Sequence, residues 1–489
     1  MRWGAAGGDQ MDLVKEAGLE REPAARSHDP LAAALGNASL IGVGYLMLGR
    51  IRLAAAATLV SVVLVASLVW GARSTWAELV VLVWWVALVG HAWFLAGGRR
   101  QGAVQHDQQL VALAVTVPVL LALGLLRFDA AGIERTVTEA RGSGDCTRAL
   151  TALDGVSFGH RVADAPLTVR GERSVEACQR LQVAEERLAD GLTGNTDGLT
   201  AGFDGLGRVL ADLPGHDRMV DTALDRFLGG LPTPDPCRTV AVTDWLRQRQ
   251  PTNNALDRSA EVVPRTAPAA LVGCADSLMT GSYWALARTR YQQLLDQYPG
   301  QGQELNVRAA EGVKKAGLAI ELATVRSLLD GTTSGQPRYC TQPAAYSAAA
   351  PYVKGRTNRA LFYGNDEYAK KLPGTWRATD VTAAVLVVCL GQKEYGTTVR
   401  SCPYENKLFP QFPTTVAFRK IAIPMKAYEL RTGKLVVTGK IQITGTSCPR
   451  ILTYTRYTGL IDTGPPSEVY VTASDANVRA AFRSLITRG

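Results

Sequence analysis

The chain has 489 residues and a formal net charge of +9, and 47% of its residues are hydrophobic. At roughly 150 residues per domain, this length predicts about three structural units and excludes a single small domain. The mean hydropathy of +0.02 averages two unlike parts, because residues 31–126 are almost continuously apolar and the remainder has the composition of a globular protein.

The first 30 residues are polar and contain the run KEAGLEREPAARSHDP. They lack the short basic start and the cleavable apolar core of a secretory signal peptide. We expect residues 1–30 to form a cytoplasmic segment that is disordered or a short frayed helix. Membrane insertion is then expected to use the first long apolar stretch as an uncleaved anchor.

Three apolar stretches are long enough, or nearly so, to span about 30 Å of hydrocarbon. These spans, within an expected membrane domain at residues 31–127, are Leu53–Gly71, Leu79–Gly97 and Leu110–Leu126. The preceding segment, Leu31–Gly49, is interrupted by polar residues and four glycines. Three interpretations stay open for it: a weak span, one arm of a re-entrant hairpin, or an interfacial helix.

Basic residues near the ends of spans favour the cytoplasmic side of a membrane. Three spans with a cytoplasmic N-terminus place eight basic residues inside and two, Arg73 and Arg127, outside, whereas four spans place four inside and six outside. Three spans are therefore favoured, which predicts a multi-pass cell-membrane protein with everything after Arg127 outside the cytoplasm. The inner set, in which Arg50 and Arg52 mark the cytoplasmic interface, is Arg2, Lys15, Arg21, Arg26, Arg50, Arg52, Arg99 and Arg100.

His91 is an ionisable residue inside the second expected span. An intramembrane ionisable group is a functional candidate by default. No charged partner lies among the spans, however, and Glu78 is at the opposite end of the same helix. We expect His91 to form a hydrogen bond between helices, and we do not expect a transporter.

Eight cysteines are present, and none precedes residue 146. An even number confined to the part after the apolar block is typical of disulfides in an oxidising compartment; reduced, buried thiols are the alternative. There is no CxxC pair, and only His160 and His216 lie beyond the membrane block, so no metal or cofactor is expected. The disulfide candidates are Cys146, Cys178, Cys237, Cys274, Cys340, Cys389, Cys402 and Cys448.

Residues 128–335 are expected to form a helical domain outside the membrane, because apolar residues recur at three- and four-residue spacing. An internal repeat is visible: GDCTRAL resembles PDPCRTVAV, EACQRL resembles VGCADSL, and LGRVLADLPG resembles YQQLLDQYPG. The repeat predicts one disulfide in each unit, Cys146–Cys178 and Cys237–Cys274.

The second copy also resembles tetratricopeptide-type helical hairpins. Residues Trp284–Gly300, WALARTRYQQLLDQYPG, have the aromatic and leucine spacing, and RAAEGVKKAGLAIEL follows as a second helix. The resemblance covers about 40 residues, and Arg288 occupies the family's small-residue position. It implies a helical-repeat binding surface, with an ordinary helical bundle as the alternative. The arginine-rich composition resembles that of actinobacterial membrane proteins.

Residues 336–489 follow the turn-rich stretch GTTSGQP and are rich in β-branched and aromatic residues, which predicts strands. The run YELRTGKLVV predicts a β-hairpin with Gly433 in its turn. Residues Asp475–Ile486 predict a terminal helix capped by Asp475. We expect an α+β domain with a mostly antiparallel sheet, in which Cys389 pairs with Cys402 and Cys340 with Cys448. The fold class is thus membrane-anchored α plus α+β.

The positive charge is concentrated in the C-terminal part. Residues 341–489 contain 20 basic and nine acidic residues, a net charge of +11. A basic face outside a bacterial membrane would attract anionic wall polymers or lipid headgroups, and nucleic acid is not expected there. The alternative is a solubilising surface with dispersed charges. The candidate binding residues are Lys420, Lys426, Arg431, Lys434 and Lys440.

No motif specifies a reaction: the chain contains no GxSxG, HExxH, Walker loop or dinucleotide fingerprint. The leading hypothesis is a non-enzymatic, membrane-anchored envelope protein whose external part binds an envelope component or a partner protein. One alternative is a membrane dock for a cytoplasmic or envelope-spanning assembly, such as a secretion or phage-tail-like injection apparatus. Another is a cell-wall hydrolase. The sequence leaves the oligomeric state open.

Overall fold

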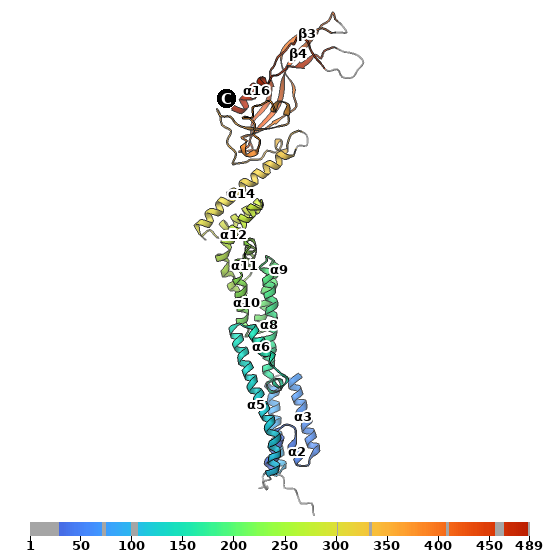
Figure 1. Cartoon of the computed structure of the whole chain (residues 1–489), viewed down its shortest axis with the longest axis vertical. Coiled ribbons are helices and arrows are strands. Elements are labelled where there is room, and N and C mark those ends of the chain that lie inside the picture. The colour runs from blue at the N-terminus through green and yellow to red at the C-terminus, as the bar shows by residue number, and fades with distance from the viewer. Residues whose placement is uncertain are drawn as a thin grey trace, which may run out of the picture. The chain divides into compact units, whose positions relative to one another are not determined.

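The computed structural model describes residues 29–70, 75–98, 106–300, 302–331, 335–406, 410–454 and 464–487. The expectations for residues 1–28, and for Arg99 and Arg100, lie outside these ranges. The chain divides into two units, Met1–Gly230 with Gln250–Ser259, and Leu231–Arg249 with Ala260–Gly489 (Figure 1). Each unit is described by itself.

The first unit begins with five helices, two of which are long and apolar enough to cross a membrane: Trp76–Leu95 within α4, and α5. A shorter apolar run, Ile51–Ser67, lies within α3. Helix α5 continues for 38 residues from its apolar start into a polar second half. The bounds are α1 Pro30–Ala38, α2 Val43–Met47, α3 Ile51–Trp70, α4 Thr75–Leu95 and α5 His106–Ser143.

Helices α1 and α2 form a short hairpin. The nine residues of α1 extend only ~14 Å at 1.5 Å per residue, about half the hydrocarbon thickness of a bilayer, so this segment is not a span. Leu40 and Gly42 reverse the chain through positive φ angles of 63° and 72°. The two arms need glycine where they touch: a Cβ on Gly44 would lie 2.0 Å from the Ala33 carbonyl oxygen. Helix α1 packs against α4 and α5, and α2 packs against α3.

The remainder of the first unit is a helical bundle in which α8 and α9 pack along each other and α10 contacts α5, α8 and α9. Asp145, Asp164 and Asn195 accept hydrogen bonds from the first-turn amides of α6, α8 and α9, which satisfies groups that have no partner within the helix. The bounds are α6 Cys146–Asp154, α7 Phe158–Ala163, α8 Ala165–Gly191, α9 Thr196–Asp212 and α10 Asp217–Gly229.

The second unit starts with helices that pack in chain order, α11 on α12, α12 on α13, and α13 on α14. Their bounds are α11 Pro236–Gln248, α12 Val263–Thr280, α13 Trp284–Gln297 and α14 Gln303–Asp330, and the 3-10 helix η1 is Ala255–Val262. Tyr291 of α13 packs on Gly312 of α14, where a Cβ would come within 2.6 Å of the tyrosine ring. This contact fixes the α13–α14 hairpin.

The order of elements in α6–α10 recurs in α11–α14, with η1 in the place of α7. In each set, an aspartate caps a helix that has a cysteine in its first turn, and the partner cysteine lies inside the third helical element. The fourth elements, α9 and α13, end alike: Leu213 and Tyr298 donate their N–H groups to carbonyls four residues earlier, over 3.0 and 2.9 Å, and a Pro-Gly pair follows.

The C-terminal part contains a six-stranded mixed sheet around the long strand β4. Strands β2, β3 and β5 pair with β4 antiparallel, whereas β1 joins β2 and β6 joins β4 in parallel. The sheet is therefore mixed, and its three longest ladders are antiparallel, in agreement with the expectation of a mostly antiparallel sheet. The bounds are β1 Ala360–Tyr363, β2 Leu386–Leu390, β3 Glu394–Tyr404, β4 Thr414–Glu429, β5 Leu435–Ile443 and β6 Glu468–Tyr470, with α15 at Asp366–Ala369, α16 at Asp475–Thr487, η2 at Arg338–Cys340 and η3 at Val381–Ala383.

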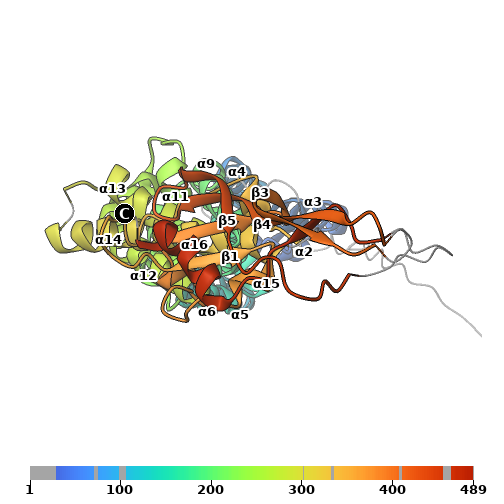
Figure 2. The ribbon, with the colours of Figure 1, turned by 90° about the horizontal axis from the view of Figure 1, so that it is seen from above.

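A helix packs on part of each face of the sheet. Helix α16 lies on one face (Figure 2), where Phe482 belongs to a hydrophobic cluster with Ile423 and Ile441. On the other face, Val325 and Leu329 of α14 join a second hydrophobic cluster with strand β2. Helix α14 therefore ends at Asp330, before the expected domain boundary at 335/336, but its last turns belong to the core of the β domain.

The β4–β5 hairpin is confirmed, with Gly433 at φ 68° in its turn. The terminal helix is confirmed as well, but its cap is Ser474 and not Asp475. The Ser474 hydroxyl accepts the Asn477 N–H over 3.3 Å, and the Asn477 side chain accepts the Ser474 N–H over 3.0 Å.

All eight cysteines are joined in four disulfides. The bonds Cys146–Cys178 and Cys237–Cys274 are those that the internal repeat predicts. The other two predicted bonds are wrong, because Cys340 pairs with Cys389 and Cys402 pairs with Cys448. The reason lies in the register of β4. Cys389 is opposite Lys426 and Cys402 is opposite Val416, ten residues apart along one strand, or ~34 Å.

Candidate functional site

A group of lysines lies on the sheet face opposite α16. Ile421, Ile423 and Met425 of β4 point toward α16, and side chains alternate between the two faces of a strand. Lys426 therefore points the other way and is exposed. On β5, Ile441 and Ile443 face α16, so the exposed Lys440, which lies opposite Pro424, shares the face of Lys426.

Lys420 belongs to the same face. A Cβ placed on Gly396 would lie 3.2 Å from both Lys420 Cβ and Gln442 Oε1, so the end of the Gln442 side chain lies beside the base of the Lys420 side chain. Six residues separate Lys420 from Lys426 along β4, which corresponds to ~20 Å. We call Lys420, Lys426 and Lys440 the lysine row.

The other two candidate residues lie elsewhere. Arg431 and Lys434 are exposed at the β4–β5 turn, beyond a register shift that follows Ala427. The alternation of side chains between the two faces of the strand therefore does not assign Arg431 or Lys434 to the face of the lysine row. The structure thus brings together three of the five predicted binding residues, and the turn carries the remaining two.

Acidic side chains compensate several basic groups of this domain. Lys440 itself donates to Glu394 over 2.6 Å. Lys393 lies 3.3 Å from Glu367, and Arg419 is paired with Glu468. Lys420 and Lys426 have no ion-pair partner among the described residues. An ammonium is a compact, hydrated point charge, so this extended, flat arrangement fits an elongated polyanion better than a small molecule.

A hydrogen-bonded Ser–His–Asp chain that the sequence reading missed lies at the start of α7. His160 Nδ1 is 2.9 Å from Ser157 Oγ, and His160 Nε2 is 2.9 Å from Asp129 Oδ2. Ser157 and Asp129 are exposed, whereas His160 is buried. The sequence could have predicted only the contact between Ser157 and His160, because a serine three residues before the histidine has the spacing of a capping box. Asp129 is 31 residues from His160, and no sequence pattern links the two.

The geometry of this chain is that of a helix cap. Nδ1 of His160 also accepts the backbone N–H of Ser157 over 3.1 Å, so one lone pair serves two donors. A serine nucleophile needs a base whose lone pair is free to take its proton. The other histidine that follows the apolar helices, His216, is buried, lies 3.1 Å from Ser174 Oγ and 2.9 Å from the Leu213 carbonyl oxygen, and holds α8 to the start of α10.

The topology residues that the structure describes lie at the start of α3. Arg50 and Arg52 are both exposed. His91 forms the expected hydrogen bond between helices: its Nδ1 lies 2.8 Å from the Tyr45 hydroxyl of α2. In the described ranges, no group of three His, Cys, Asp or Glu side chains is placed to hold a metal ion.

No protein family, curated protein or solved structure matches the chain at a significant level.

Proposed function

We propose that the protein is a non-enzymatic, membrane-anchored envelope protein whose lysine row binds an anionic wall polymer outside the cytoplasmic membrane. The observation that supports the proposal is that Lys420, Lys426 and Lys440 lie on one face of the sheet. Two disulfides cross-link the domain that contains this sheet. The +11 charge of residues 341–489 would raise the local concentration of an anionic polymer around this face.

The proposed orientation has three spans with the N-terminus inside. Asp29, at the start of α1, accepts a hydrogen bond from the Gln109 side chain and donates its N–H to Gln108 Oε1 at the start of α5. Since α1 and α2 reverse within the apolar layer, Arg50 returns to the side on which α1 began. The start of α3 and the start of α5 then share the cytoplasmic side, as the excess of basic residues favours. The four disulfides support an oxidising exterior for the rest of the chain.

The recurring elements of α6–α10 and α11–α14 support a duplicated helical module that lies between the membrane helices and the β domain in the sequence. In this proposal, the long α5 helix leads from the bilayer into the first module and α14 leads from the second module into the sheet. The resemblance of α13–α14 to tetratricopeptide hairpins suggests that these helices offer a second surface, for a protein partner.

The test uses the full-length protein in nanodiscs and immobilised teichoic acid, with binding measured at several salt concentrations. Replacing Lys420, Lys426 and Lys440 by glutamine should weaken binding about tenfold at low salt, because each exposed charge contact contributes roughly 0.5 kcal/mol. The salt dependence should fall as well. Equal binding by this variant and the native protein would overturn the proposal.

A matched control variant removes three positive charges from other positions of the second unit. Lys314, Lys315 and Lys354 are exposed lysines of the second unit outside the lysine row. Their replacement by glutamine should leave binding close to that of the native protein. If both triple variants lose affinity equally, net charge and not the lysine row is responsible.

A cell-wall hydrolase is the second candidate, favoured only by the Ser157–His160–Asp129 chain. Turnover of peptidoglycan or of a model ester by the full-length protein would support it, provided that Ser157→Ala abolishes the activity. Turnover that Ser157→Ala leaves intact would point to a different site.

A further inference from the structure

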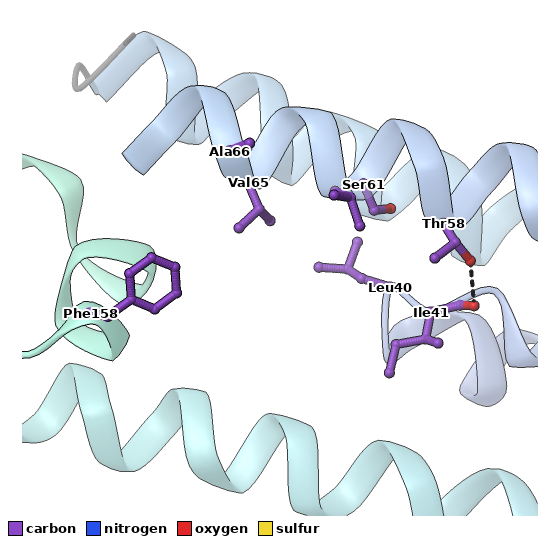
Figure 3. A pocket seen from close by; sticks show the side chains of 8 residues that line it. Leu40, Ile41, Thr58, Ser61, Val65, Ala66 and Phe158 are labelled. Atoms are coloured by element: carbon purple, nitrogen blue, oxygen red, sulfur yellow. Dashed lines mark hydrogen bonds between the residues drawn. The ribbon is translucent and has the colours of Figure 1, made fainter. Parts of the chain in front are cut away.

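The apolar helices of the first unit line a laterally open cavity of about 540 Å³ between α3, α4 and α5. Its walls include Leu82 and Trp85 of α4, Leu123 of α5 and Val65 of α3. A second hollow, of about 330 Å³, shares Val65 with it and continues along α3 (Figure 3). We call the two together the interhelical cavity.

The α1–α2 hairpin closes one end of the interhelical cavity. Leu40 and Ile41 point into it from the turn of the hairpin (Figure 3). The Thr58 hydroxyl donates to the Ile41 carbonyl oxygen over 2.8 Å and attaches this turn to α3. The interhelical cavity therefore ends at this turn, and a separate hollow lined by Leu46, Ile51 and Val63 lies beyond it along α3.

Helix α7 closes the other end. Phe158 faces the hollow along α3, and Val162 and Ala163 line the larger space. Arg127 of α5 donates through Nε to the Ala163 carbonyl oxygen over 2.8 Å and holds α7 in this position. Phe158 and Trp76 are both largely exposed, at 62% and 77%, as aromatic residues at a membrane–water interface commonly are.

The length of the cavity along the helix axes determines which kind of molecule it can hold. Its lining on α4 runs from Glu78 to Trp85, which is only ~10 Å along a helix axis. A membrane-spanning helix of a partner needs about 30 Å of continuous apolar contact, and the hairpin and α7 obstruct it at both ends. A flexible hydrocarbon chain that enters sideways between α3 and α5 meets neither obstacle.

One end of the cavity is polar. Arg127 Nη2 lies 3.3 Å from Glu78 Oε2 beside α7, and the Arg127 side chain is 61% exposed. The remaining lining is almost entirely apolar. Apolar walls with one accessible guanidinium at the interface match an amphiphile that has a hydrocarbon tail and an anionic head.

We propose that the interhelical cavity holds an acyl chain of a phospholipid from the surrounding bilayer, whose phosphate meets Arg127. The inference rests on the membrane insertion proposed above and is independent of the lysine row.

The test incorporates the full-length protein into nanodiscs that contain a phospholipid with a photoreactive diazirine in its acyl chain, and maps the labelled peptides. Gly124 lines the cavity, and a Cβ there would meet nothing within 4 Å, so Gly124→Phe should fill the space without a clash. Gly90 on α4 is equally open and does not line the cavity, so Gly90→Phe is the matched control.

We expect labelling on Val65, Leu82 and Leu123 in the native protein, a several-fold decrease in Gly124→Phe, and no change in Gly90→Phe. Labelling restricted to outward residues such as Val63 in all three proteins would overturn the inference while leaving membrane insertion intact. Absence of any labelling on α4 and α5 would instead overturn membrane insertion. Labelling by a free photoreactive fatty acid but not by the phospholipid, or cross-linking to a second polypeptide, would overturn the assignment of the occupant.

Discussion

The Gln109 side-chain amide donates a hydrogen bond to Asp29 Oδ2 over 2.6 Å and thereby joins the first turn of α5 to the start of α1. Asp29 also caps α1, because its other carboxylate oxygen accepts the Leu31 N–H over 2.9 Å. The side chain is 3% exposed. This one buried carboxylate thus determines the residue at which α1 begins. It also places the start of α1 beside the start of α5.

Removing this carboxylate should loosen the α1–α2 hairpin. We expect Asp29→Ala to lower the melting temperature of the full-length protein in detergent, with a loss of about 1 kcal/mol for the cap alone. Asp107→Ala, which removes an exposed carboxylate from the first turn of α5, is the control and should change the melting temperature less. Equal effects of the two variants would contradict the role assigned to Asp29.

Two glycines of α14 should respond in opposite directions to the same substitution. Gly312→Ala would push a methyl group into the Tyr291 ring and should destabilise the protein by about 1–3 kcal/mol. A Cβ on Gly317 would meet nothing within 4 Å, so Gly317→Ala should stabilise the helix by up to about 1 kcal/mol. Chemical denaturation of both variants measures the difference, and a stabilising Gly312→Ala would refute the α13–α14 packing.

The disulfide pattern predicts specific cross-linked peptides. Proteolysis under non-reducing conditions, followed by mass spectrometry, should recover Cys340 linked to Cys389 and Cys402 linked to Cys448. Replacing Cys402 and Cys448 together by serine should cost about 2–4 kcal/mol of unfolding free energy, because the bond restricts the unfolded chain. Recovery of Cys389 linked to Cys402 would contradict the sheet register.

Asp380 predicts a defined dependence of stability on pH. Hydrogen bonds from the Thr382 hydroxyl and N–H, together with Arg326 of α14, lower the pKa of Asp380 to about 2 from an ordinary value of 3.8. A lowered pKa in the folded state stabilises the protein above the ordinary value, and this contribution is lost as the pH falls from 3.8 toward 2.

The comparison that tests this is thermal unfolding of the native protein and Asp380→Asn between pH 7 and pH 3. The native protein should melt at a higher temperature than Asp380→Asn at pH 7. This difference should shrink below pH 4, since about half of the stabilising contribution of the Asp380 carboxylate is lost by about pH 3. A difference that stays constant across this range would mean that Asp380 acts only through the shape of its side chain.

The local architecture was largely predictable from the sequence. The repeat of GDC and PDPC motifs correctly paired the helical cysteines, because equivalent positions in two similar modules have equivalent neighbours. The hairpin around Gly433 and the terminal helix followed from turn chemistry and periodicity. Hydropathy could not decide the arrangement of residues 31–49, because the reversal depends on Leu40 and Gly42 adopting left-handed backbone angles.

The wrong predictions have a common cause, because the pairing of residues that are far apart in the sequence cannot be derived from local patterns. Cys389 and Cys402 are close in sequence, but each is bound to a different stretch of β4. The lysine row likewise depends on which residues of β4 and β5 face α16, and the register shift near Ala427 removes Lys434 from a simple alternation. The contact between His160 and Asp129 joins elements whose packing no local pattern specifies.

Sidedness is the claim on which the account depends, and labelling of intact cells tests it most directly. All eight native cysteines are in disulfides, so single cysteines introduced by Lys315→Cys on α14 and by Arg52→Cys on α3 can be labelled selectively with a membrane-impermeant maleimide. The account predicts that Lys315→Cys reacts in intact cells and that Arg52→Cys reacts only after permeabilisation. Protection of Lys315→Cys in intact cells, or reaction of Arg52→Cys without permeabilisation, would contradict it.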